Sequence, residues 1–424
     1  MALFHPNPRL ESVLDRHLEA MAAAEGLSPD GVAAAVAAGT MTVLANPGHG
    51  GVRPTLIGQP AAIKVNANIG TSPLLNDAAM EGEKLRICET AGADTVMDLS
   101  TAGDLDAIRR GMLAATFLPL GTVPVYAVAN RYIAAEADPA GMTEDEILAE
   151  IEKQAAQGVD FMTVHCGVTA RAVDLSREEE RVTGIVSRGG AILARWMRRN
   201  GRENPFYGRF DDILDIARAH NVVLSLGDGL RPGAGADAGD AAQWEEVIEL
   251  GRLARRARAR GVQVMIEGPG HVPLNLVGAH IQCIKRLTAQ APLYVLGPLT
   301  TDCAPGYDHI GAAIGGALAG TFGADFLCYV TPAEHLTLPC ADDVRQGIMA
   351  SRIAAQAAET ARGRERAVSR NRDMSRARKA LDWEAMAELA IDPALVRERR
   401  RQFGHQKECA MCGKFCAVRM QDGL

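Results

Sequence analysis

The chain has 424 residues, enough for two or three domains or for one large barrel with appendages. Hydrophobic residues make up 47% and charged residues 23%, a composition that gives no support to a disordered or fibrous protein. With 45 Lys and Arg against 52 Asp and Glu, the net charge of -7 argues against nucleic acid as a partner and favours a small-molecule ligand. The longest uncharged apolar run, residues 310–324, is shorter than the ~20 residues that cross a bilayer. The amino end lacks a basic-then-apolar signal pattern, so we expect a cytoplasmic protein that contacts no membrane.

The segment 1–40 predicts helices, because alanine-rich stretches follow one another without a strand-like run. From residue 63 onward, short apolar runs that end in Gly or a polar residue alternate with charged helical stretches, which predicts a parallel α/β sheet. The runs are 63–70, 94–100, 119–126, 160–167, 183–190, 222–229, 262–271, 293–302 and 325–331. Nine runs are one more than the eight strands of a closed (β/α)8 barrel. Because the run 183–190 follows its predecessor most closely, we assign it to a loop or a short extra strand. The remaining eight predict a (β/α)8 TIM barrel.

After Cys340 the pattern becomes helical again, with Asp342 and Asp343 at one helix start and Asp392-Pro393 at another. We interpret the segment Arg362 to Lys379, which is rich in Lys and Arg, as a solvated connector rather than an RNA-binding surface. The expected domains are an N-terminal helical and loop domain (1–60), the catalytic barrel (61–338), a C-terminal helical domain (339–400) and a metal-binding tail (401–424).

Reactive side chains fall at or just past the carboxyl ends of the predicted strands, where a barrel gathers its active-site loops. They are Asn68, Asp98, Tyr126, His165, Asp228, Glu267, His271, Asp302 and the stretch Thr331 to His335. Any one of them could be polar only because strand ends meet solvent. The shared register of all of them predicts an active site at this end.

Three cysteines, Cys409, Cys412 and Cys416, crowd together near the end of the sequence. Thiolates this close together on a tail with little apolar surface indicate a metal site. A closed Cys3His zinc site would use His405, whereas a [4Fe-4S] cluster held by three cysteines would leave one iron open. The spacing alone leaves both alternatives open.

Two further patterns point to ligands. His271 and His335, at the ends of the last strand regions, could together hold one metal ion, and His309 is a weaker candidate of the same kind. Ser187-Arg188-Gly189-Gly190 precedes a helical sequence, so free backbone N-H groups would lie beside a guanidinium. Asp228-Gly229-Leu230-Arg231 adds a second arginine at another strand end. Together these two segments suit a phosphorylated sugar.

Long segments in chain order carry a resemblance to one family. They are VNANIG, TVMDLS, GTVPVY, TVHCG, TGIVSRGG, SLGDGLRPG, QVMIEGPGHVP, YVLGPLTTD, APGYDHI, LCYVTPAEHLTLP and CAMCGKFC, between residues 63 and 416. The chain thereby resembles the ThiC-type radical S-adenosylmethionine (SAM) enzymes. This resemblance implies a homodimeric carbon-carbon lyase with a (β/α)8 barrel, an unidentified electron donor and a cluster on a mobile tail.

Residue by residue, the resemblance makes Cys409, Cys412 and Cys416 the [4Fe-4S] ligands and His271 and His335 the ligands of a second metal, usually assigned as zinc. It implies a binding site for 5-aminoimidazole ribonucleotide, lined by Asn68, Met97, Tyr126, His165, Ser187, Arg188, Gly189, Asp228, Gly229, Leu230, Arg231, Glu267 and Tyr294. The implied reaction begins when a 5'-deoxyadenosyl radical from SAM abstracts hydrogen from the ribose. We assign Glu267 and Asp228 to hydrogen bonding or proton transfer as candidate catalytic residues.

Enzymes of this family make one of two kinds of product. Its pyrimidine synthases usually have Pro-Ala-Asn-x-Asn-His before the first strand, whereas this chain has Leu44-Ala45-Asn46-Pro47-Gly48-His49. Because proline fixes φ, the loop differs. We therefore favour 5-hydroxybenzimidazole, made with release of formate for the lower ligand of cobamides (vitamin B12), over the thiamine precursor 4-amino-5-hydroxymethyl-2-methylpyrimidine phosphate. Two other hypotheses are a zinc-dependent barrel lyase or hydrolase with a structural zinc tail, and a non-catalytic nucleotide-binding regulator that uses residues 362–379.

Overall fold

The computed structural model describes residues 6–421 of the chain. The residues up to Ala355 form one compact unit, and those from Gln356 onward form a second. The four-part division expected from the sequence is finer than this one and stays a prediction.

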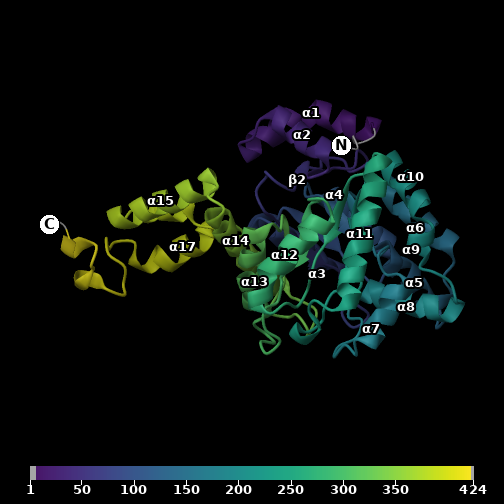
Figure 1. Cartoon of the computed structure of the whole chain (residues 1–424). Helices are drawn as coiled ribbons and strands as arrows, with labels where there is room; N and C mark the ends of the chain where they lie inside the picture. Colours follow the sequence, from purple (N-terminus) through teal and green to yellow (C-terminus); the bar gives the residue numbers. More distant parts are fainter. Residues whose placement is uncertain (1–5, 422–424) are drawn as a thin grey trace. The chain divides into compact units, whose positions relative to one another are not determined.

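The first unit contains a closed barrel of eight parallel strands, which confirms the predicted fold (Figure 1). The strands are β3 (Lys64–Ile69), β4 (Thr95–Asp98), β5 (Leu120–Thr122), β6 (Phe161–Val164), β7 (Val223–Leu226), β8 (Val264–Glu267), β9 (Leu293–Leu296) and β10 (Phe326–Cys328). They pair in chain order, and β10 closes the barrel against β3 with Leu327 opposite Val65. Residues 183–187 form a loop, as expected for the ninth run.

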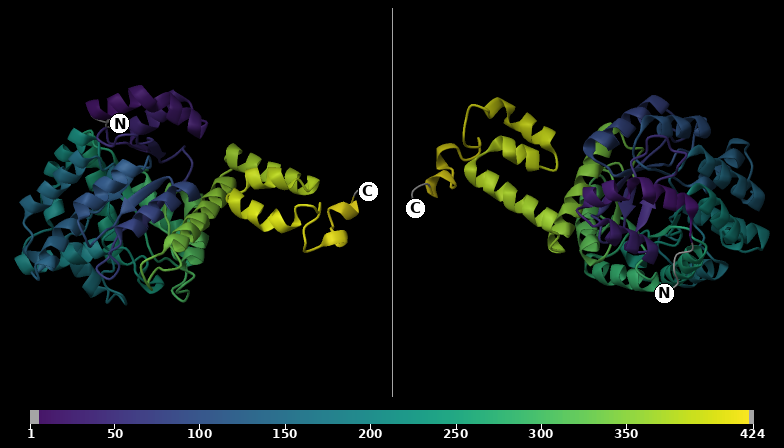
Figure 2. Two further views of the ribbon diagram at one scale, coloured as in Figure 1. Left: turned by 180° about the vertical axis from the view of Figure 1, so that it is seen from behind. Right: turned by 90° about the horizontal axis from the view of Figure 1, so that it is seen from above.

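Helices surround the strands, and the view from above shows them as a ring (Figure 2). They are α3 (Ala78–Ala91), α4 (Leu105–Ala115), α5 (Pro124–Ala134), η1 (Pro139–Gly141), α6 (Glu144–Gln157), α7 (Ala170–Glu178), α8 (Arg188–Asn200), α9 (Pro205–Gly208), α10 (Phe210–His220), η2 (Gly235–Asp237), α11 (Ala241–Ala259), α12 (Leu274–Leu287), α13 (Asp308–Phe322) and α14 (Ala341–Ala361). Local signals set their ends. Thr143 and Glu146 form a capping box at the start of α6, and Gly92 ends α3 in the left-handed conformation, with φ 82°.

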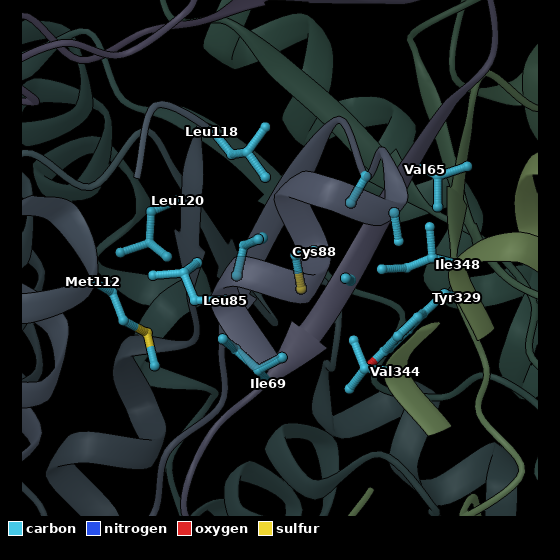
Figure 3. Packing of buried hydrophobic residues seen from close by; sticks show 14 of the residues in the cluster. Val65, Ile69, Leu85, Cys88, Met112, Leu118, Leu120, Tyr329, Val344 and Ile348 are labelled. Carbon is cyan, nitrogen blue, oxygen red and sulfur yellow. The ribbon is translucent and has the colours of Figure 1, made fainter. Parts of the chain in front are cut away.

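Apolar side chains from the strands and the helices pack together between these two layers. One cluster joins Val65 and Ile69 of β3 to Leu85 and Cys88 of α3 and to Ile348 of α14 (Figure 3). Burial on both faces explains why the parallel strands are continuous apolar runs rather than alternating ones. The rigid wall built in this way fixes where each strand ends, and hence where the polar residues at those ends lie.

The amino-terminal segment adds α1 (Pro8–Glu25), α2 (Pro29–Ala38) and a two-stranded antiparallel sheet of β1 (Thr42–Leu44) and β2 (Thr55–Ile57). The sequence does not predict this sheet, since such short strands leave little periodicity. Gln263, just before β8, accepts from the Val43 backbone N-H at 2.8 Å, and Asn221, just before β7, donates to the Ala45 carbonyl at 2.8 Å. These segments therefore pack at the amino ends of the strands.

The Asn46–His49 loop is bound to the same end of the barrel. Asp160, the residue before β6, accepts from the Asn46 backbone N-H at 2.7 Å and from His49 Nδ1 at 2.7 Å. Both Asp160 and His49 are buried. The loop lies at the amino end of β6, whereas barrel active sites lie at the carboxyl ends of the strands. Its unusual sequence therefore gives no reason to prefer one product over another.

His49 and Asp160 form a buried ion pair with a predictable effect on stability. The two ring nitrogens of His49 face the Asp160 carboxylate and the Thr116 carbonyl, which both accept, so the ring carries both protons. Burial lowers the pKa of His49, but the hydrogen bond and charge of Asp160 outweigh it and raise the pKa above its ordinary value. The contribution of His49 is therefore complete below about pH 6.5 and is lost as pH rises through its raised folded-state pKa. Burial also raises the pKa of Asp160, so the pair loses its charge at low pH as well.

We expect His49→Gln to lower the free energy of unfolding by about 3 kcal/mol at pH 6, because it leaves the Asp160 carboxylate buried without its partner. The deficit is expected to shrink toward pH 9, where the wild type loses the same interaction. Denaturation of both proteins at each pH measures this. The control is His220→Gln, which removes a partly exposed histidine paired with Glu152. A deficit equal at both pH values would contradict the ion pair.

The second unit is helical. Beyond the end of α14 it contains α15 (Glu365–Ala380), α16 (Trp383–Leu389), α17 (Pro393–Arg400) and the short helices η3 (Arg401–Phe403), η4 (Gly413–Phe415) and η5 (Arg419–Gln421). The segment 362–379, expected as a connector, is largely helix α15, whose polar side chains remain mostly exposed. Within residues 6–421, no helix is both long and apolar enough to span a membrane.

Candidate active site

A cavity of about 90 Å³ opens at the carboxyl ends of the barrel strands. Among the predicted site residues, eight line it: Asn68, Met97, Tyr126, His165, Asp228, Arg231, Glu267 and Tyr294. Thr163 and Cys328, which the sequence analysis did not select, line it too. Small-molecule pockets in proteins usually measure ~300 to 1,000 Å³. The cavity can therefore hold only part of a ribonucleotide, and the rest would extend toward the surrounding loops.

A chain of hydrogen bonds crosses the barrel wall on one side of the cavity. Asn66 Nδ2 donates to Asn68 Oδ1 and to the Tyr294 hydroxyl, both at 2.7 Å. Asn68 Nδ2 donates in turn to Cys328 Sγ at 3.0 Å. Burial raises the pKa of the Cys328 thiol to about 12, so the thiol keeps its proton. These contacts fix the orientation of the Asn68 amide and of the Tyr294 hydroxyl at the cavity.

Two carboxyl groups face the cavity. Glu267 Oε1 accepts from Thr163 Oγ1 at 2.7 Å and from Ser225 Oγ at 2.8 Å, so side chains of β6 and β7 hold it. Burial raises the pKa of Glu267, although these two hydroxyl groups partly offset it. Burial raises the pKa of Asp228 well above its ordinary value, against the opposing charge of Arg231. Burial therefore favours the protonated form of both groups compared with an ordinary exposed carboxyl group.

The start of α8 is packed tightly against the cavity wall. Ser187 caps the helix by accepting from the Gly190 backbone N-H at 3.2 Å. A Cβ on Gly189 would lie 2.3 Å from the His165 ring, and one on Gly190 would lie 2.3 Å from the Gly229 carbonyl oxygen. Only glycine fits at either position. The structure thus brings the Ser187–Gly190 and Asp228–Arg231 segments together, as an anion site shared by the two would require.

Arginines add positive charge at the same place. The Arg188 guanidinium lies over the Tyr126 ring, 4.8 Å from its centroid, and Arg231 lies 3.1 Å from Asp228 Oδ1. Burial and the nearby Arg231 lower the pKa of His165 to about 3, so the imidazole is neutral. Two buried polar atoms, His165 Nδ1 and Asp228 Oδ2, have no hydrogen-bond partner within residues 6–421. Such atoms are costly to bury and indicate a polar ligand.

The predicted binding residues that do not line the cavity have different surroundings. Ser187 and Gly189 belong to the start of α8, and Gly229 packs against Gly190. Leu230 is fully buried, in a small apolar cluster with Ala172 and Ala242. Its side chain therefore serves packing, and only its backbone could reach a ligand.

His271 and His335 lie side by side, with ring centroids 5.5 Å apart. Each presents Nδ1 to an aspartate: His271 lies 2.7 Å from Asp302, and His335 lies 3.5 Å from Asp308. This leaves Nε2 of both rings for another ligand, an arrangement typical of metal-binding histidines. His335 has φ 62°, a left-handed conformation that costs energy for a residue other than glycine and is frequent at functional sites. Within residues 6–421, His271 and His335 contact each other, whereas His309 stacks with Tyr307.

The cysteine-containing loop, residues 405–421, belongs to the second unit. The Gly413 backbone N-H donates to the Cys409 carbonyl at 3.1 Å, which folds Cys409 and Cys412 into one turn, and Cys416 is buried. Backbone N-H groups of Cys412 and Met411 lower the pKa of the Cys409 thiol, which favours the ligating thiolate. Within residues 6–421, no three His, Cys, Asp or Glu side chains are gathered as a metal ion would need. Neither the three cysteines by themselves nor the cysteines with His405 are gathered in this way, so the arrangement does not choose between zinc and iron.

The stem of this loop is anchored to the helices of its unit. Arg400 donates to the carbonyls of Phe403 at 3.0 Å, Gln406 at 2.6 Å and Glu408 at 3.2 Å. The guanidinium stacks on Trp383, whose indole N-H donates to the Lys407 carbonyl at 2.8 Å. The loop is thus held at its base by one arginine and one tryptophan.

Replacing Arg400 by alanine is expected to raise amide hydrogen exchange across residues 403–416 roughly 10-fold, because three carbonyls lose their donor. Hydrogen exchange followed by mass spectrometry measures this in protein without the metal. The control is Arg399→Ala, since Arg399 is exposed on the same helix. Equal exchange in the two variants would show that the loop is held by something else.

Comparison with protein families gives a match over nearly the whole sequence. The model of the radical SAM ThiC family matches residues 9–423. The chain belongs to this family. It is therefore a radical SAM enzyme of the lyase type, which confirms the family inferred from the motifs.

Curated relatives of similar length carry one name. The phosphomethylpyrimidine synthases of Carboxydothermus hydrogenoformans and Moorella thermoacetica are 50% and 52% identical to this chain, over 97% and 96% of it and over 96% and 94% of their own lengths. One from Thermus thermophilus is 51% identical over 94% of this chain and 92% of its own. A solved dihydropteroate synthase of Coxiella burnetii covers 72% of this chain and 96% of its own at 12% identity, with a TM-score of 0.42, too weak a likeness to add to the argument.

Sequence reasoning missed residues of two kinds. Cys328 lies at the carboxyl end of β10, and the rule that selected Asn68 and Glu267 would have found it if cysteine had been counted among the reactive residues. Thr163 and Ser225 lie inside strands, just before the expected strand ends, and act by holding Glu267. No pattern in the sequence marks them, because their role depends on contacts across neighbouring strands.

Proposed function

We propose that the protein is a phosphomethylpyrimidine synthase that converts 5-aminoimidazole ribonucleotide to 4-amino-5-hydroxymethyl-2-methylpyrimidine phosphate for thiamine biosynthesis. The observation that carries the proposal is the junction of the α8 start with the Asp228–Arg231 turn. Two guanidinium groups and a helix start meet there beside a cavity with unpaired polar atoms. A ribose phosphate suits such a site, because its phosphate fits the guanidinium groups and the helix start while its sugar fits the polar cavity. The names of the relatives favour the pyrimidine product.

The residues of the chain divide into three roles toward this substrate. Arg188, Arg231 and the backbone of Gly189 would bind the phosphate. Asn68, Tyr294 and neutral His165 would hydrogen-bond the imidazole and the ribose. Glu267 and Asp228, both with raised pKa values, would donate or accept protons as the ring system rearranges. The buried walls around these groups exclude water from reactive intermediates.

The three cysteines suit the [4Fe-4S] cluster that radical SAM chemistry uses. Cys409 and Cys412 lie on one turn, the thiolate of Cys409 is favoured, and Cys416 follows four residues later on the same loop. When bound, the cluster and SAM supply the 5'-deoxyadenosyl radical that abstracts hydrogen from the substrate. The chain's own part is to hold the thiolates and keep the ribose in place. A homodimer and a separate electron donor complete the proposal.

We further propose that His271 and His335 hold a divalent metal ion, zinc being the usual choice. The donor set fits, because Asp302 holds Nδ1 of His271 and leaves its Nε2 for the metal, and Nδ1 of His335 faces Asp308 at 3.5 Å. Metal analysis and isothermal titration with zinc test this in protein without the cluster. His335→Ala is expected to abolish binding at this site, whereas His309→Ala is expected to leave it unchanged. Equal zinc affinity in wild type and His335→Ala would overturn the assignment.

The product is tested by anaerobic incubation of reconstituted protein with 5-aminoimidazole ribonucleotide, SAM and a reductant, followed by mass spectrometry. A phosphorylated pyrimidine is the expected product. A non-phosphorylated 5-hydroxybenzimidazole would replace our proposal with the other activity of the family. Iron and acid-labile sulfide are measured on the same preparation, since an active protein with zinc alone would overturn the radical mechanism. RNA binding without turnover would instead favour a regulatory role.

A further inference from the structure

Two loops carry the proposed phosphate-binding residues. One, residues 179–187, leads directly into Arg188 and Gly189 at the start of α8, and the other, residues 227–240, follows β7 and contains Arg231. They are far apart in the sequence, and the anion site exists only where they meet. What holds them together therefore bears on how well the site binds.

Arg181 joins the two loops. Its Nε and Nη2 atoms pair with the two carboxylate oxygens of Asp240, and Nη2 also donates to the Leu230 carbonyl at 2.7 Å. The Arg181 and Asp240 side chains are 1% and 9% exposed. A bidentate pair of this kind fixes direction as well as distance, and its burial protects it from competition with water.

Other contacts support the same junction. Asp237 accepts from the backbone N-H groups of Val182 at 2.8 Å and Thr183 at 3.1 Å, and from the Thr183 hydroxyl at 2.8 Å. From behind, Glu246 of α11 accepts from the Leu230 backbone N-H at 2.8 Å. Both backbone groups of Leu230 are thus held by buried side chains, the carbonyl by Arg181 and the N-H by Glu246. Because Leu230 precedes Arg231, these bonds set where the Arg231 side chain begins.

Arg181 itself cannot serve as a ligand-binding residue. It does not line the cavity, and its donors point to Asp240 and to the carbonyls of Leu230 and Arg231. A buried ion pair adds little net stability compared with an apolar pair of similar size, but it can select one arrangement of the segments that it joins. A positioning role therefore predicts a change in ligand affinity, whereas a merely structural role predicts a change in stability alone.

We propose that Arg181, through Asp240, is a positioning residue that keeps the Asp228–Arg231 turn in register with the start of α8 and thereby sets the affinity for the substrate's phosphate group. This inference rests on the proposed function. It assigns the specificity for a phosphorylated ligand partly to a residue that never touches the ligand.

The test is isothermal titration of protein without the cluster, with 5-aminoimidazole ribonucleotide and with the corresponding riboside, which lacks the phosphate. For Arg181→Lys, which keeps the charge but loses the bidentate fit, we expect the dissociation constant of the ribonucleotide to rise roughly 10-fold or more. The constant for the riboside is expected to change less than about 2-fold, because the residues around the ring are untouched. The matched control is Arg171→Lys, an exposed arginine 3.7 Å from Glu245.

A second variant tests the same interaction in case Arg181→Lys does not fold. Asp240 also caps α11 by accepting from the Gln243 backbone N-H at 2.8 Å, and Asn caps a helix about as well as Asp. Asp240→Asn should therefore keep the helix start, lose the charge and reproduce the ribonucleotide defect. In the double variant with Arg181→Lys, the two losses should not add, because both act on one interaction.

The outcomes distinguish a failure of the positioning role from a failure of the proposed function. Unchanged ribonucleotide affinity in folded Asp240→Asn, or equal losses for ribonucleotide and riboside, would overturn the positioning role. A wild-type protein that binds the riboside as tightly as the ribonucleotide would instead refute the phosphate site of the proposed function. Circular dichroism and thermal unfolding establish that each variant is folded.

Discussion

Replacement of Cys412 by alanine is expected to abolish product formation while leaving 5-aminoimidazole ribonucleotide binding unchanged. Two thiolates cannot hold the cluster as three do, so iron and acid-labile sulfide should fall with the activity. The residues that line the cavity all belong to the first unit, whereas Cys412 belongs to the second. Anaerobic reconstitution with iron analysis gives the cluster content, and titration of the protein without the cluster gives substrate affinity.

The matched control is Cys283→Ala, because Cys283 is also exposed but lies on α12 of the first unit. It should keep full iron content and full turnover. If Cys412→Ala retained both, the tail cysteines would not be the cluster ligands, and the assignment would have to move to other thiols of the chain. Loss of activity with full iron content would point to a role for Cys412 other than ligation.

Arg231→Met is expected to raise the dissociation constant for the ribonucleotide roughly 10- to 100-fold, the usual effect of losing a hydrogen bond to a charged group. Arg231 lies at the cavity, and its charge lowers the pKa values of Asp228 and Glu267 against the effect of burial. Its loss should therefore raise both pKa values further and move the pH dependence of turnover to higher pH. Isothermal titration and a pH profile of kcat/KM measure the two effects.

Arg231→Lys separates charge from geometry, since lysine keeps the charge but cannot bind phosphate with two parallel hydrogen bonds. It should leave the pH profile close to that of the wild type and still weaken binding. Arg177→Met is the control, because Arg177 is 58% exposed and its pair with Asp174 spans 3.8 Å. Unchanged ribonucleotide affinity in Arg231→Met would remove this arginine from the phosphate site.

The Leu44–His49 loop is where sequence and structure lead to different conclusions about the product. Its sequence differs from the family pattern, and that difference favours a product other than the pyrimidine. The structure ties Asn46 and His49 to Asp160 at the amino end of β6. The loop lies away from the cavity, so its departure from the family pattern concerns packing at the amino ends of the strands. The names of the relatives favour the pyrimidine product instead.

The eight-strand barrel and six of the residues that line the cavity could be predicted from residues alone; Met97 and Tyr294 came from the family resemblance. Parallel strands buried on both faces leave continuous apolar runs, and the polar residue that ends each run marks the carboxyl end of a strand. Closure of the barrel then brings Asn68, His165 and Glu267 together, although they lie far apart in the sequence. The family resemblance added the expectation that the tail cysteines hold an iron-sulfur cluster, a choice that spacing alone leaves open between zinc and iron.

Only the tertiary structure revealed what holds that site. Arg181, Glu246 and Asp240 look like ordinary charged residues of loops and helices, and nothing in their spacing shows that they meet around Leu230. Hydrogen bonds between segments that are distant in sequence depend on the angle and separation of packed elements, whereas the periodicity of apolar residues can be read from neighbours along the chain. For this reason the sequence determined the barrel and its reactive end, and the folded structure decided which buried side chains hold the two segments of the proposed anion site together.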